Sequence, residues 1–303
     1  MKLGRRLFHD PKLSGDETVS CATCHSLDHG GAEARRTSTG IGSQVGPINS
    51  PTVLNAEFNF KQFWDGRAAD LAEQAAGPIT NPLEMGGDWP QLLERLNADP
   101  TYVNGFAALY PDGITQQSVI DAIVQYERSL VTPSRFDAFM RGDDEALAEA
   151  ELRGLQRFKE VGCTSCHTGV NLGGQSFQKM GLVRSYFEER GGELTEADLG
   201  RYNVTRQEAD KHFFKVPTLR NVTVTDPYFH DGSEPELASA VRTMARVQLG
   251  RNLSDEEVSD LVAFLGALTG ELPAEARLPE GRAPEGAEAA EAVPHDVKNI
   301  VEA

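Results

Sequence analysis

The chain has 303 residues, of which 46 are acidic and 29 basic, so it carries a formal net charge of −17 at pH 7. This balance argues against nucleic-acid binding; it favours a basic partner, or serves only to keep the protein soluble. The length fits about two globular domains, and no apolar run approaches the roughly 18 residues of a membrane span.

A helical pattern with long loops rich in Gly and Pro follows a short amphipathic segment at the start of the chain. Residues 116–130 carry apolar side chains near helical spacing, which predicts a helix. Pro133 and the Arg141–Asp143 segment interrupt this pattern. We therefore predict a mostly α protein with a domain boundary near residues 133–145.

Two more helices are predicted in the second half of the chain. Residues 145–160 place apolar side chains near helical spacing, and Gly162 follows as a stop signal. Ser254 and Glu257 form a capping box that begins another helix, which we expect to pack against the first. Residues 271–303 are rich in Ala, Glu and Pro without periodicity, which predicts an acidic tail.

All four cysteines belong to two copies of the motif Cys-x-x-Cys-His, at Cys21–His25 and Cys163–His167. Two Cys-x-x-Cys pairs are also compatible with a zinc site or with redox pairs, but neither needs a histidine after each second cysteine. In c-type haem attachment, both thiols bind the porphyrin and the histidine becomes the proximal iron ligand. The sequence therefore predicts two covalently bound haem c groups, held by Cys21, Cys24, His25, Cys163, Cys166 and His167.

Each motif lies in a different half of the chain, so we assign one haem to residues 1–140 and the other to residues 141–270. Covalent haem attachment takes place outside the cytoplasm. Because no signal peptide precedes the first motif, we expect that a leader was removed and that the mature protein is periplasmic.

The sixth iron ligand decides between electron transfer and catalysis, because a thioether raises the potential whereas an open position binds substrate. Met180 lies 13 residues after His167, and Met244 lies 77 residues after it. A short connection rarely crosses to the opposite haem face, so spacing favours Met244. For either methionine, packing in a core is the alternative.

Five further segments resemble the bacterial dihaem cytochrome c peroxidase family: Leu3–Phe8, Pro51–Asn55, Gln62–Arg67, Val216–Asn221 and Pro227–Gly232. The resemblance runs from residue 3 to residue 268 and includes both haem motifs in order. It implies two cytochrome c-like haem domains with long loops. It also implies reduction of hydrogen peroxide to water, with electrons from a small cytochrome c or a cupredoxin.

The resemblance further implies roles for single residues. The first haem, with proximal His25, is the low-potential, peroxide-binding one. The second is the high-potential haem that receives electrons, with ligands His167 and Met244, so the matched methionine is Met244 rather than Met180.

Other family positions also have counterparts here. The tryptophan between the haems falls on Trp64, and the distal glutamine and glutamate fall on Gln74 and Glu84. An interdomain calcium site maps to Asn49, Thr225 and Pro227. Family members often form homodimers, which makes a homodimer an expected assembly.

The residue type at position 84 suits peroxide chemistry, because heterolysis requires a proton to move from one peroxide oxygen to the other. A buried carboxylate with a raised pKa can move that proton, and Gln74 can hydrogen-bond the oxygens or a water. Taken alone, Glu84 would be a solvated loop charge and Trp64 a core residue.

One position departs from the family pattern. Many members carry a histidine in the loop after the first motif that caps the resting iron, and this position is Ile41 here. His29 lies only four residues after His25 and would share its side of the haem. We therefore expect an open first haem that reacts with peroxide without prior reduction.

The missing histidine also keeps two other functions open. A related dihaem enzyme that matures the tryptophan-derived cofactor of methylamine dehydrogenase lacks the same histidine, but it has tyrosine where this chain has Met244. Met244 favours a peroxidase. The alternatives are an oxidase that acts on a partner protein and a dihaem electron carrier or sensor.

Overall fold

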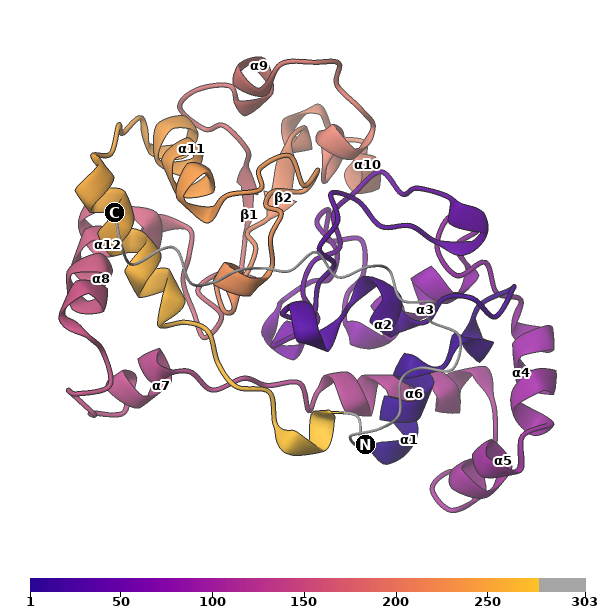
Figure 1. Cartoon of the computed structure of the whole chain (residues 1–303). Helices are drawn as coiled ribbons and strands as arrows, with labels where there is room; N and C mark the ends of the chain where they lie inside the picture. The colour runs from indigo at the N-terminus through magenta and orange to yellow at the C-terminus, as the bar shows by residue number, and fades with distance from the viewer. Residues whose placement is uncertain (278–303) are drawn as a thin grey trace.

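The computed structural model describes residues 1–277, which form two groups of helices, α1–α6 and α7–α12, with a two-stranded ribbon beside α11 in the second group (Figure 1). The first half comprises α1 Lys2–His9, α2 Cys21–Cys24, α3 Leu71–Thr80, α4 Trp89–Asn97, α5 Pro100–Ala107 and α6 Gln116–Glu127. The second comprises α7 Arg135–Met140, α8 Glu149–Val161, α9 Tyr186–Arg190, α10 Tyr202–Thr205, α11 Leu237–Leu249 and α12 Asp255–Gly266. Strands β1 Phe177–Lys179 and β2 Phe213–Lys215 pair antiparallel. The mostly α fold is confirmed.

In the first half, the helix before the first motif packs against the helix that ends this half. Helix α1 crosses α6 at Gly4, where an added Cβ would lie 1.7 Å from the carbonyl oxygen of Ala122. Only glycine permits this approach. Leu7, Phe8 and Tyr126 are fully buried in the resulting core.

The second half repeats this arrangement. Helix α8 leads to the second motif and packs against α12 at Gly154, where an added Cβ would lie 1.9 Å from the carbonyl oxygen of Asp260. Phe158 and Phe264 fill the core beside this contact. The expected pairing of these two helices is confirmed.

The predicted helices appear with shifted ends. Helix α6 ends three residues before the predicted position 130, and α8 begins at Glu149 rather than at residue 145. The carboxylate of Glu151 accepts the backbone N–H of Ala148, which starts α8 there. The capping box at Ser254 is confirmed, with its hydroxyl accepting the Glu257 backbone N–H.

The beginning of the predicted tail is packed rather than free. After α12 the chain returns to the first half, where Ala276 is buried and Leu272 packs against the α1–α6 core. The Tyr126 hydroxyl donates to the carbonyl of Ala276 at 2.7 Å. The rest of the predicted tail, from residue 278, lies outside the described residues. Within residues 1–277, no helix is both long and apolar enough to cross a membrane.

Candidate haem sites and the path between them

The first motif forms a single helical turn, α2, which is capped at its N-terminus by Ser20. His25 ends the turn, and its Nδ1 lies 3.3 Å from the carbonyl oxygen of Gly31. Burial lowers the pKa of His25 to about 4, so the imidazole is neutral. Donation from Nδ1 leaves Nε2 as the lone-pair nitrogen, which is the state that binds iron.

The second motif has the same geometry on a different support. Gly162 ends α8 with a φ of 103°, and a short 3₁₀ turn over Cys163–Ser165 follows. His167 Nδ1 lies 3.0 Å from the carbonyl oxygen of Leu172, and burial lowers the pKa of this imidazole. Both histidines therefore present Nε2 for a metal.

The four cysteines are free thiols and do not converge on a zinc site. Within the described part of the chain, one group of three or more His, Cys, Asp or Glu side chains has ligand atoms within 4.8 Å of one another, and it contains no cysteine. Burial raises the pKa of the thiols, to about 12 for Cys24 and about 11 for Cys163. Thiols paired next to an oriented histidine fit haem attachment.

A cavity of about 270 Å³ lies against the second motif and reaches the first half of the chain. Its wall is mainly apolar and includes His167, Met180 and Met244. Met244 comes from α11, and β1 brings Met180 to the same cavity. The 13-residue connection after His167 therefore does not keep Met180 away from this cavity. Spacing alone does not decide which of the two methionines is the iron ligand.

Trp64 lies on this wall between the two halves. Its Nε1 donates to the carbonyl of Asn49 at 2.9 Å, and its ring meets the edge of His230 with centroids 6.5 Å apart. The Asn49 backbone N–H in turn donates to the carbonyl of His230 at 2.8 Å. These contacts hold the indole ring in one orientation. A tryptophan that only fills a core would not need them.

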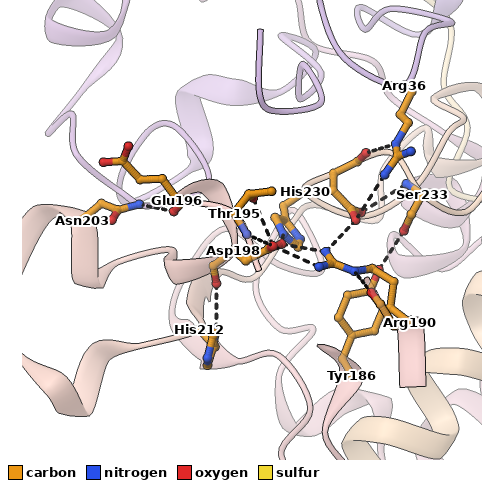
Figure 2. A network of polar contacts seen from close by, with 12 residues as sticks. Arg36, Tyr186, Arg190, Thr195, Glu196, Asp198, Asn203, His212, His230 and Ser233 are labelled. Carbon is orange, nitrogen blue, oxygen red and sulfur yellow. Dashed lines mark hydrogen bonds and ion pairs between the residues drawn. The ribbon is translucent and has the colours of Figure 1, made fainter. Parts of the chain in front are cut away.

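His230, to which the sequence assigns no catalytic role but a possible part in haem packing or the domain interface, is the centre of a buried polar network (Figure 2). Its Nε2 lies 2.8 Å from Asp198, which also accepts two hydrogen bonds from Arg190. Arg190 also donates to Asp231 at 2.9 Å. Although burial acts to raise the pKa of Asp198, its hydrogen bonds from Arg190 hold that pKa well below its usual range. Asp198, His230 and Asp231 are the metal-like group noted above, but Arg190 already compensates their charge.

No local sequence signal could have joined these residues, because they come from separate segments. Arg36, in the first half, also donates to the backbone carbonyl of Asp231 at 3.1 Å. The network therefore holds the His230 ring against which Trp64 packs. Through Arg36 it also links the two halves (Figure 2).

Glu84 lies in the turn after α3 and accepts a 2.7 Å hydrogen bond from the Asn81 side chain. Burial raises its pKa, opposed by the charge of Arg67 and by the bond from Asn81. Glu84 is close enough to Cys24 that its charge contributes to the raised pKa of that thiol. Gln74 is half-buried on α3, and within residues 1–277 no hydrogen bond joins its side chain to Glu84.

The loop that carries Ile41 is fixed to the Glu84 turn. The Ile41 backbone N–H donates to the carbonyl of Glu84 at 2.8 Å, and Gln44 donates to the carbonyl of Pro82 at 2.8 Å. The Ile41 side chain covers Gly86, where an added Cβ would lie 2.2 Å from its Cδ1. Position 41 thus has a structural partner in this turn.

The three residues expected at a calcium site, Asn49, Thr225 and Pro227, line the same cavity. The Asn49 side-chain N–H₂ donates to the carbonyls of Arg35 and Arg36 at 3.2 and 3.3 Å. Its side-chain oxygen is the atom that a hard cation would use.

A family model for di-haem cytochrome c peroxidases matches residues 1–145. The chain is 49% identical over 270 residues to the cytochrome c peroxidase Ccp of Escherichia coli, covering 88% of this chain and 57% of that one. It is 48% identical to the cytochrome c551 peroxidase of Nitrosomonas europaea, covering 90% and 80%. The chain thus spans little more than half the length of the first relative.

Among solved structures, a MauG-like protein associated with microbial copper homeostasis superposes with a TM-score of 0.80 at 28% identity, covering 89% of each chain.

Proposed function

The chain belongs to the di-haem cytochrome c peroxidase family, and from this premise we propose that it reduces hydrogen peroxide to water with electrons from a small redox protein. The donor is a small cytochrome c or a cupredoxin. When bound, the two haems supply iron for peroxide binding at the first motif and for electron storage at the second. The observation that carries the proposal is the half-buried Glu84, whose pKa is raised and whose charge reaches Cys24 of that first motif.

Glu84 is the proton carrier in this proposal. Reduction of one peroxide consumes two electrons and two protons and forms two waters. The Glu84 carboxylate accepts a proton from one peroxide oxygen and returns it to the other, and the desolvation that raises its pKa makes it a stronger base for the first step. Gln74 positions the oxygens or a water. Asn81 holds the carboxyl group in place.

Trp64 would carry electrons toward a haem held at the first motif. Its fixed position on the cavity wall supports this role. Met244 and His167 are the proposed ligands of the second iron, and Met180 is the competing ligand from the same wall. Replacing Met244, but not Met180, with leucine should abolish a methionine-ligated spectrum.

The Glu84→Gln variant tests the proton role. We expect its rate of reaction with peroxide to fall by about 10²- to 10⁴-fold, because an amide cannot exchange the proton. Stopped-flow absorption measures this rate. Glu94→Gln, the same change at an exposed glutamate on α4, should react at the wild-type rate. Equal rates for Glu84→Gln and wild type would exclude Glu84 as the carrier.

We also propose that the enzyme is ready without reductive activation. Ile41 cannot bind iron, and its loop is hydrogen-bonded to the Glu84 turn. Electron paramagnetic resonance of the fully oxidised protein should give a high-spin ferric signal, and peroxide added before any reductant should change the spectrum at once. The Ile41→His variant should lose part of the high-spin signal. Two low-spin haems and a lag in the wild-type protein would contradict this proposal.

The proposal also includes the division into domains, a calcium site, the cellular location and the assembly. Residues 1–140 and 141–270 each hold one haem, and the two Gly-mediated helix pairs support this division. Asn49, Thr225 and Pro227 bind calcium, the protein is periplasmic, and it forms a homodimer.

A second candidate function is oxidation of a partner protein. One observation favours it: position 41 is isoleucine rather than the capping histidine, in a chain similar to a MauG-like protein. Mass spectrometry of co-encoded proteins after peroxide treatment would detect this activity. Steady peroxide turnover with a reduced cytochrome would exclude a carrier or sensor without turnover.

A further inference from the structure

Lys215 is a buried cation on the wall of the cavity that contains the second motif. It is the last residue of β2 and is only 6% exposed. Its backbone N–H donates to the carbonyl of Trp64 at 2.8 Å, so this part of β2 lies directly beside the proposed electron path. His167 and Met244 line the same cavity.

No counterion within residues 1–277 compensates this charge. The Nζ of Lys215 forms no ion pair and no side-chain hydrogen bond with a described residue. Burial lowers its pKa to about 8, which still leaves an ammonium group at neutral pH. Arg220 is equally buried, but two 2.7 Å hydrogen bonds to Asp137 neutralise it. Unlike Arg220, Lys215 therefore has no acidic partner among the described residues.

The composition of the cavity wall points to the same conclusion. Its described residues include no aspartate, glutamate or arginine, so Lys215 is the one lysine and the one side chain among them that is mainly charged at neutral pH. The chain as a whole carries a net charge of −17. An ammonium group that faces a mainly apolar cavity without a partner is unfavourable, and an anion entering the cavity would lower this cost.

We propose that Lys215 Nζ binds a carboxylate in this cavity, namely a propionate of the haem attached to Cys163 and Cys166. The inference rests on the haem assignment that underlies the proposed function. The ion pair fixes the edge of the porphyrin beside Trp64. Because a nearby positive charge favours the reduced iron, it also raises the potential of the second haem.

Redox titration of the holoprotein tests this role. In Lys215→Gln, the reduction potential of the second haem should fall, and it should become dependent on pH because the propionate then takes up a proton on reduction. Lys215→Arg should keep most of the wild-type potential. Lys179→Gln removes the same charge from an exposed position on neighbouring β1 and should change nothing.

Resonance Raman spectra supply a second measurement, since the propionate bending mode responds to a hydrogen bond at the carboxylate. This mode should shift in Lys215→Gln and not in Lys179→Gln. Unchanged potential and Raman mode in Lys215→Gln would overturn the proposal. If Lys215→Gln does not fold, the potential of the wild-type second haem is measured with and without added acetate or phosphate. A potential that depends on either anion would assign Lys215 to a free anion and overturn the proposal. A potential that depends on neither would support the proposal.

Peroxide turnover, measured on the same samples, separates this inference from the proposed function. A shifted potential without turnover in the wild-type protein would refute the peroxidase and leave the Lys215 assignment intact. Normal turnover with no shift in Lys215→Gln would refute the assignment alone.

Discussion

Burial acts in opposite directions on the acids and bases of the two sites. It raises the pKa of Glu84 and lowers the pKa of His25, and both shifts favour the neutral group. A neutral imidazole can bind iron, and a carboxylate whose pKa is raised accepts a proton more readily. These residue types were evident from the sequence, but their burial was not. Neither Glu84 nor Trp64 could be distinguished from an ordinary residue without the family resemblance.

Glu127, on α6, is another buried acid, and it provides a test through stability. Its Oε2 has no hydrogen-bond partner among the described residues, and burial raises its pKa from 4.5 to about 8. Between these two values the unfolded chain has lost a proton that the folded protein keeps. Stability from this group therefore falls as pH rises from about 4.5 to 8 and is constant outside that window.

The Glu127→Gln variant should remove this dependence. We expect it to be more stable than the wild type at pH 7, by on the order of 3 kcal/mol, and equally stable at pH 4. Urea denaturation at a series of pH values measures the difference. Glu94→Gln should follow the wild-type curve. A difference between Glu127→Gln and wild type that is constant with pH would contradict the buried, proton-retaining carboxyl group.

At the scale of elements, periodicity and caps predicted α6, α8 and α12 with errors of a few residues at their ends. These signals are local, since each depends on neighbours three or four residues away. The contact between α8 and α12 depends on a glycine at one point. In the sequence, Gly154 is only a weak helix former. Its role in the close contact between α8 and α12 could be recognised only from the packed helices.

The Gly154→Ala variant tests this contact. An added Cβ would lie 1.9 Å from the Asp260 carbonyl oxygen, so the helices must separate. We expect a loss of about 1–3 kcal/mol in the free energy of unfolding, measured by chemical denaturation. Gly266→Ala, at the end of α12, meets nothing within 4 Å and should stabilise by about 0.5–1 kcal/mol. Wild-type stability in Gly154→Ala would show that the helices tolerate a wider spacing.

At the scale of the whole molecule, buried polar side chains connect the two halves. The amide groups of Asn55, from the first half, and Asn221, from the second, both donate to the Thr132 hydroxyl, at 2.8 and 2.9 Å. Asn171 donates to the Asn55 carbonyl at 3.0 Å. Together with the return of residues 272–276 to the first core (Figure 1), these bonds tie the halves into one body.

Replacing Thr132 with valine should weaken both halves together. The change keeps the shape of the side chain but leaves two buried amide donors without their acceptor, which costs roughly 2–4 kcal/mol. Thr132→Ser keeps the hydroxyl and should lose less than about 1 kcal/mol. Unfolding followed by absorption of each haem measures the effect. Loss of stability in only one half would mean that Thr132 does not couple them.

The sequence by itself determined the two haem motifs, their histidines and the main helices, because covalent attachment chemistry and helical periodicity depend on a few adjacent residues. Tertiary structure alone decided which side chains share a buried space. It brought Met180 and Met244 to one cavity, left Lys215 there without a counterion, and joined His230 to Asp198 and Arg190. Burial and charge compensation arise between segments far apart in the chain, so no local pattern encodes them.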